Sequence, residues 1–83
     1  MTARLDPATV TLDAWLDADK ELRAARKRLA AASERRRALP AGSSRAKVTT
    51  ANARWATAAE AHDLIDRALR DRWEAAQASK GAP

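Results

Sequence analysis

The side chains of this chain that could do chemistry are cationic, and they gather in one segment. Between residues 23 and 54, ten lysine and arginine side chains are accompanied by a single acid, Glu34, which gives a net charge of +9. The segments before and after it carry net charges of −3 and −1. Such a cluster predicts electrostatic binding of phosphate or carboxylate groups. We assign to this candidate anion-binding tip Arg35, Arg36, Arg37, Ser43, Ser44, Arg45, Lys47 and Arg54.

The charges on the two sides of a central turn differ in how well they suit a helix. The arginines at 35–37 close a predicted helix, where cations complement the helix dipole. Arg45 and Lys47 fall in the first turn of the next predicted helix, where the same dipole disfavours positive charge. Residues 42–47 also combine free helix N–H groups, two hydroxyls and two cations, as in an anion cradle. Because a broken local rule often marks a functional requirement, we favour an anion-facing tip over a merely solvated surface.

The charge alone is compatible with two classes of partner. Non-specific nucleic-acid binding needs only basic side chains near phosphates, but the tip has no aromatic residue on which bases could stack. The zinc-ligand spacing, the short helix-turn-helix and the basic region of a leucine zipper are all missing from the sequence. We therefore expect an acidic protein partner, which could be the acidic end of a second copy. Nucleic acid is the alternative.

Other titratable residues do not form a convincing reactive group. His62 and Asp66 have the i, i+4 spacing of two ligands on one helical face, but the chain offers no further histidine and no cysteine. The carboxylates of Asp13, Asp17 and Glu21 follow the same spacing, yet a rod gives them no cavity in which to act as acid and base. We expect no enzyme activity, no metal site and no cofactor.

Two long helices must position the cationic residues. Asp6 is a suitable N-cap and Pro7 a suitable first helical residue, while Pro40 disfavours helix just before it and Gly42 allows a turn. Ser43 or Ser44 then caps the second helix. The predicted single domain over 1–83 therefore contains a helix over about 7–38, a turn over 39–43 and a helix over about 44–79.

The apolar residues predict how these helices pair. Large residues recur every seven positions, and alanines follow three positions later, as in a coiled-coil seam. A fold about residues 41–42 pairs Leu29 with Trp55 and Trp15 with Leu69. The pattern predicts an all-α, antiparallel two-helix hairpin with an Ala-rich, coiled-coil-like seam. We assign to this helix-packing seam Leu12, Trp15, Leu22, Leu29, Trp55, His62, Ile65, Leu69 and Trp73.

The composition indicates that such a hairpin is incomplete by itself. Leu, Ile, Val and Phe number only eleven among 83 residues, so the seam is thin support for so much ordered chain. Alanines outside the seam are either solvated filler or a second packing face; they include Ala53, Ala61, Ala68 and Ala75. We expect completion by self-association into a dimer or higher oligomer, or by docking on a larger protein. Opening of the turn at Pro40, with pairing between two chains, is the alternative.

The remaining sequence features concern location. The chain has no cysteine, no apolar run of membrane-spanning length and no basic-then-apolar signal peptide. We expect the cytoplasm of the producing or host cell and no membrane partner, and a virion component stays open. The predicted function is a non-enzymatic helical interaction or assembly protein with a cationic tip. The alternative is a nucleic-acid-binding accessory protein that uses the same tip.

Overall fold

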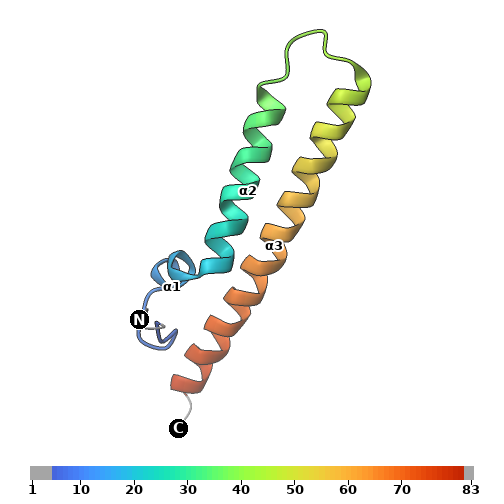
Figure 1. Ribbon diagram of the computed structural model, residues 1–83. Coiled ribbons are helices and arrows are strands. Elements are labelled where there is room, and N and C mark those ends of the chain that lie inside the picture. Colours follow the sequence, from blue (N-terminus) through green and yellow to red (C-terminus); the bar gives the residue numbers. More distant parts are fainter. Residues whose placement is uncertain (1–4, 82–83) are drawn as a thin grey trace.

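The computed structural model describes residues 5–81, and these residues form three helices and no strand (Figure 1). The helices are α1 (Leu12–Ala18), α2 (Lys20–Arg37) and α3 (Arg45–Gly81). The prediction of an all-α chain is therefore confirmed. The outermost parts of the predicted domain, 1–4 and 82–83, lie outside the described residues.

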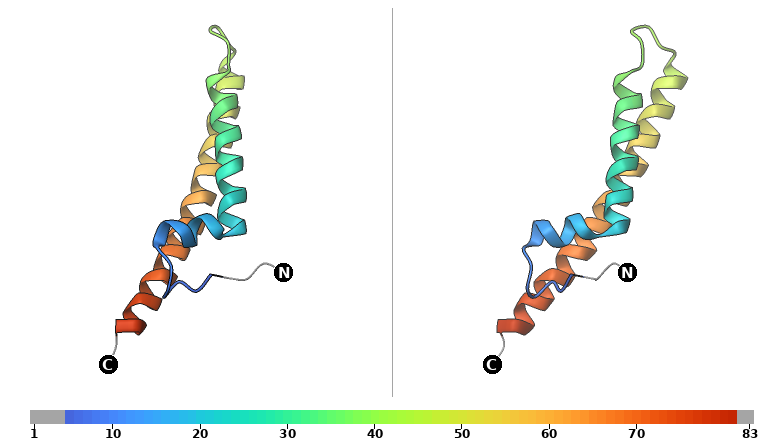
Figure 2. Two further views of the ribbon diagram at one scale, coloured as in Figure 1. Left: turned by 90° about the vertical axis from the view of Figure 1, so that its left-hand side faces the viewer. Right: turned by 60° about the vertical axis from the view of Figure 1, so that its left-hand side comes forward.

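The shape follows from the unequal lengths of the helices. α2 and α3 lie side by side and run antiparallel, and α1 crosses α3 beyond the start of α2 (Figures 1 and 2). At about 1.5 Å per residue, α3 is roughly 55 Å long and α2 roughly half of that, within overall dimensions of 62 × 26 × 16 Å. We call the loop end, residues 32–54, the tip. We call the opposite end, residues 5–25 together with 62–81, the base.

The chain becomes helical later than the sequence predicts. Asp6 does act as a cap, because its Oδ1 accepts a hydrogen bond from the Ala8 N–H at 2.9 Å, but it caps only a single turn. The β-branched run at residues 9–11 follows, and such residues are poor helix formers. Thr11 then caps α1 by accepting from the Ala14 N–H at 3.2 Å.

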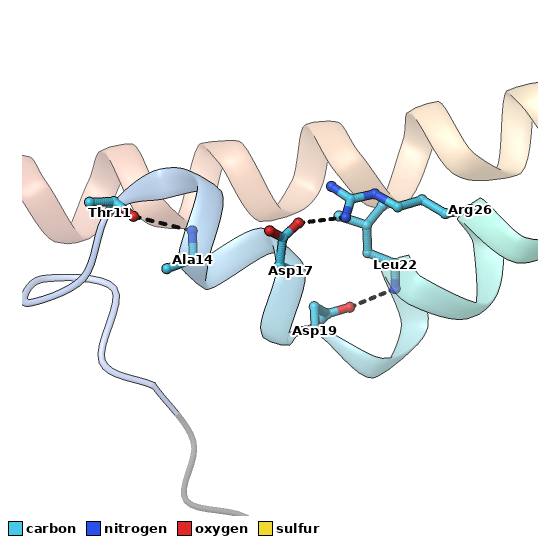
Figure 3. A network of polar contacts seen from close by, with 6 residues as sticks. All are labelled: Thr11, Ala14, Asp17, Asp19, Leu22 and Arg26. Carbon is cyan, nitrogen blue, oxygen red and sulfur yellow. Dashed lines mark hydrogen bonds and ion pairs between the residues drawn. The ribbon is translucent and has the colours of Figure 1, made fainter.

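The continuous helix predicted over 7–38 is wrong, because the chain bends between α1 and α2 (Figure 3). Asp19 has an extended backbone, with ψ of 123°, and its carboxylate accepts from the Leu22 N–H at 2.8 Å. This side chain satisfies a free N–H group of α2, as an N-cap does. An ion pair of 2.7 Å between Asp17 and Arg26 spans the bend. The bend lets α1 turn across α3 instead of extending α2.

The core lies entirely in the base. The buried residues of the described chain are Leu16, Leu22, Ala25 and Leu69. The half-buried residues of the predicted seam are Leu12, Trp15, Leu29, Trp55, His62, Ile65 and Trp73. Leu16, which the seam prediction omitted, is buried because the bend turns α1 so that Leu12, Trp15 and Leu16 share the face toward the core. Ala18, a seam position in an uninterrupted helix, is exposed.

The last turns of α3 hold the segment that precedes α1. Three side chains donate hydrogen bonds to its backbone carbonyl groups: Trp73 Nε1 to Val10 at 3.4 Å, Gln77 Nε2 to Pro7 at 2.6 Å, and Lys80 Nζ to Ala8 at 2.9 Å. The half of α3 that α2 does not reach is thus covered by α1 and by this segment (Figure 2). Trp73, a residue of the predicted seam, is half-buried in this contact.

Candidate functional site

The loop between α2 and α3 forms the end of the tip. Gly42 has a φ of +86°, a conformation that favours glycine. The Ser43 hydroxyl donates to the Pro40 carbonyl oxygen at 2.6 Å, and the Ser44 hydroxyl accepts from the Lys47 N–H at 3.3 Å. Ser44, rather than Ser43, is therefore the cap of α3. Both hydroxyls bond the loop's own backbone, so the predicted anion cradle is already partly filled from within.

The three consecutive arginines at the end of α2 have three different surroundings. The Arg36 guanidinium lies over the Trp55 ring, 4.7 Å from its centroid, in a cation–π contact. Arg37 donates to a carboxylate oxygen of Glu34 at 3.1 Å. Arg35 borders a groove between α2 and α3. The sequence placed these arginines in one anion site, but only Arg35 contributes to this groove.

Trp55 joins α2 to α3 where the tip begins. Its Nε1 donates to the Ser33 hydroxyl at 3.0 Å, in addition to the Arg36 contact on its ring. The predicted partner was Leu29, one helical turn further from the loop. Trp55 thus contacts Ser33 and Arg36 through polar interactions, which a heptad pattern of apolar residues does not predict.

The groove between α2 and α3 in the tip has a volume of about 350 Å³. Its lining consists of Ala32, Arg35, Leu39, Ala46, Lys47, Thr50, Ala51 and Arg54. The cavity exists because small residues oppose each other without a large side chain between them. Arg36 occupies the next large position of the α2 heptad, but its side chain lies over Trp55 and does not line the groove. Val48 does not line it either and is 38% exposed. The result is an apolar floor with a cationic rim.

The rim cations are not neutralised by the acidic side chains that the structure describes. Among residues 5–81, no acidic side chain forms an ion pair with Arg35, Lys47 or Arg54. Glu34, the only acid of the basic segment, bonds Arg37 instead. Arg45 is exposed but does not line the groove. Uncompensated cations beside an apolar floor can bind a partner that brings carboxylates and apolar groups together.

A second candidate surface lies on the outer side of α3, away from α2. Leu64 is 60% exposed, the most exposed of the large apolar residues that the structure describes. The exposed small residues that continue its stripe at helical spacing are Ala53, Thr57, Ala61, Ala68 and Ala75, and the charged Glu60 and Asp71 stand at the same spacing. Small residues beside an exposed leucine let another helix approach closely. Sequence periodicity identified the alanines of this face but not Leu64.

The residues weighed as metal ligands or as an acid–base pair have other polar partners or are exposed. The His62 side chain is 21% exposed, and its Nδ1 lies 3.1 Å from an oxygen of Asp63 rather than of Asp66, which bonds Arg70. Asp13, like Asp17 and Glu21, is exposed on the surface of the base. Within residues 5–81, no three His, Cys, Asp or Glu side chains gather as metal ligands. The helices of this part of the chain are too short or too polar to cross a bilayer.

The groove and the outer side of α3 are thus two candidate surfaces among the described residues. The groove combines charge with apolar area, whereas the outer side of α3 presents Leu64 and small residues, with the charged Glu60 and Asp71 at the same helical spacing. Comparisons of the chain with protein-family models, with curated proteins and with solved structures each found no match.

Proposed function

We propose that this protein is a small, non-enzymatic interaction or assembly protein that presents its cationic tip to an acidic partner protein. The observation that carries this proposal is the groove, where Arg35 of α2 and Lys47 and Arg54 of α3 surround an apolar floor. These cations have no acidic partner within residues 5–81. Complementary charge guides association and fixes orientation, and the apolar floor adds area that is removed from water.

The proposal includes a second contact, through the outer side of α3. The paired helices α2 and α3 form a coiled-coil-like hairpin that a second copy or a larger protein completes. The thin core supports this view, because the buried residues of the described chain are few and all lie in the base. Leu64 and the neighbouring alanines are the surface that such a contact would cover.

Anisotropy of a labelled polyglutamate peptide tests the tip. We expect binding at low salt that weakens at moderate salt, because exposed charges are screened. Replacing Arg35, Lys47 and Arg54 together with glutamine should weaken it about tenfold, since each rim charge contributes a fraction of a kcal/mol. A matched control removes the same charge from exposed positions of α2 outside the groove, with Arg23, Lys27 and Arg28 changed to glutamine. Equal weakening in both variants would contradict a defined site.

A single-stranded oligonucleotide, added to the same experiment, separates the two classes of partner. The proposal expects polyglutamate to bind at least as well as the oligonucleotide at equal ionic strength. Tighter oligonucleotide binding that is lost with the Arg35, Lys47 and Arg54 changes would favour the nucleic-acid-binding accessory protein instead.

Molar mass in solution tests the contact through α3. We expect size-exclusion chromatography with light scattering to give a discrete dimer or higher oligomer that persists at moderate salt. Leu64→Glu should return the mass toward the 9.0 kDa of one chain, because a carboxylate cannot be buried there without a partner. The control Asn52→Glu places the same charge on α3 away from the stripe. A mass of 9.0 kDa for the unaltered protein contradicts self-association and leaves docking on a larger protein.

A further inference from the structure

We infer that the groove of the tip binds an acidic amphipathic helix of the partner protein. This inference rests on the proposed function and deepens it, because it names the form of the acidic ligand. Such a helix would lie between α2 and α3, set its apolar side chains on the alanine floor and direct its carboxylates to the rim cations. Helices that lay an apolar face into a groove are a recurrent mode of recognition.

The spacing of the groove residues on α3 matches the repeat of a helix. Lys47, Thr50, Ala51 and Arg54 stand at i, i+3, i+4 and i+7, so the two cations are two turns apart. At 1.5 Å per residue, this separation is roughly 10 Å along the axis. A ligand helix with carboxylates at its own i and i+7 positions and apolar residues at i+3 and i+4 repeats the same distances. Its apolar pair then lies between the two charged contacts.

The opposite wall of the groove completes this match. Arg35 extends from α2 on the other side of the cavity, so one ligand carboxylate is within reach of cations from two helices. The planar guanidinium can bind a carboxylate through two parallel hydrogen bonds. Ala32, Leu39 and Ala46 line the apolar floor, and the small size of the alanine side chains allows the ligand helix to approach closely.

The apolar floor favours a protein helix over a nucleic acid. A phosphate backbone would use the cations of the rim alone and leave the floor uncovered. The floor also lacks an aromatic side chain, whereas stacking on aromatic side chains is the usual way to hold unpaired bases. An acidic helix with leucines uses both parts of the groove at once.

The test uses fluorescently labelled, alanine-based helical peptides and the full-length protein. The probe carries Glu at i and i+7 and Leu at i+3 and i+4. One matched peptide replaces both leucines with glutamine, and a second replaces both glutamates with glutamine. We expect the probe to bind at least about tenfold more tightly than either matched peptide, because each of them loses one of the two complementary contacts.

Variants of the protein locate the binding. Ala51→Phe and, separately, Ala46→Phe fill the groove without changing any charge, and we expect each to weaken probe binding at least about tenfold. Ala46 is exposed, so the second substitution keeps the test valid if the first disturbs the packing of α2 on α3. The control Ala30→Phe adds the same ring at an exposed position of α2 outside the groove and should leave binding unchanged.

The outcomes separate this inference from the proposed function. If polyglutamate binds but the leucine and glutamine peptides bind equally, the inference fails and the acidic partner stands. If no acidic probe binds, the proposed function fails as well. If the protein self-associates and Ala51→Phe abolishes that association, a second copy occupies the groove, and the inference of a separate partner helix is overturned.

Discussion

The base and the tip are built from the same kind of helix, yet they differ in what fills the space between helices. In the base, α1 crosses α3, and leucines from all three helices close the core, with Leu22 fully buried at 0% exposure. In the tip, only α2 and α3 are present, and alanines oppose each other across a groove. The base therefore has the contacts that stabilise the fold, and the tip has the open groove that we propose as a binding site.

The difference also explains where the charges lie. Cations repel one another, so a cluster of them is least harmful where few packing contacts depend on close approach. The tip meets this condition because none of its residues is buried. Arg36 has a cation–π partner and Arg37 an acidic partner, whereas Arg35, Lys47 and Arg54 form no ion pair among residues 5–81. The proposed binding surface and the stabilising core thus lie at opposite ends of one rod.

The largest expected effect tests whether stability resides in the base. Leu22→Ala should reduce the free energy of unfolding by about 3 kcal/mol, because it leaves a cavity in a closed core. Leu39→Ala removes the same atoms from the open wall of the groove and should cost less than about 1 kcal/mol. Urea unfolding followed by circular dichroism measures both values. Equal losses would show that the tip shares in the stability of the fold.

A smaller effect concerns the bend that makes the base possible. Asp19→Ala removes the cap of α2 and should reduce the free energy of unfolding by about 1 kcal/mol. Asp17→Ala removes only a solvent-exposed ion pair with Arg26 and should cost about 0.5 kcal/mol or less. The same urea experiment compares them. A larger loss for Asp17 would mean that the ion pair, rather than the cap, fixes the bend.

The smallest effect is expected at the rim of the groove. Changing Arg35, Lys47 and Arg54 to glutamine should alter the free energy of unfolding by no more than about 0.5 kcal/mol, with a slight gain as mutual repulsion is lowered. Thermal unfolding at low and moderate salt measures the change, and the gain should shrink as salt screens the charges. A loss above about 1 kcal/mol would indicate that these cations support the fold and are not free for a partner.

Much of the helical organisation could be predicted because it depends on local signals. Pro40 and Gly42 mark the turn, and the second helix runs without interruption from Arg45 to Gly81, near the predicted 44–79. The bend was missed although Asp19 is a good capping residue. Aspartate is a poor helix former, but the spread of propensities among ordinary residues is below about 1 kcal/mol, so one capping residue is a weak signal beside a seam pattern that continues through the bend.

The candidate site was predictable only in its charge. The net charge of the segment located the tip, but the separate surroundings of Arg35, Arg36 and Arg37 depend on which side chains of α3 lie opposite. Likewise, the sequence shows Leu64 only as an apolar residue outside the seam, and its exposure on the outer side of α3 is evident only in the structure. Charge adds up along a sequence, whereas a cavity depends on the sizes of side chains that come together from distant segments.

The sequence by itself determined that this chain is helical, that it turns near Gly42 and that its cations gather at that turn. These properties follow from backbone preferences, capping residues and charge order, all of which act between near neighbours. Only the tertiary structure decided that Leu16 enters the core, that Trp55 holds Arg36 and that a groove opens beside Arg35. The physical reason is that packing is a relation between surfaces, and the bend at Asp19 fixes which surfaces meet.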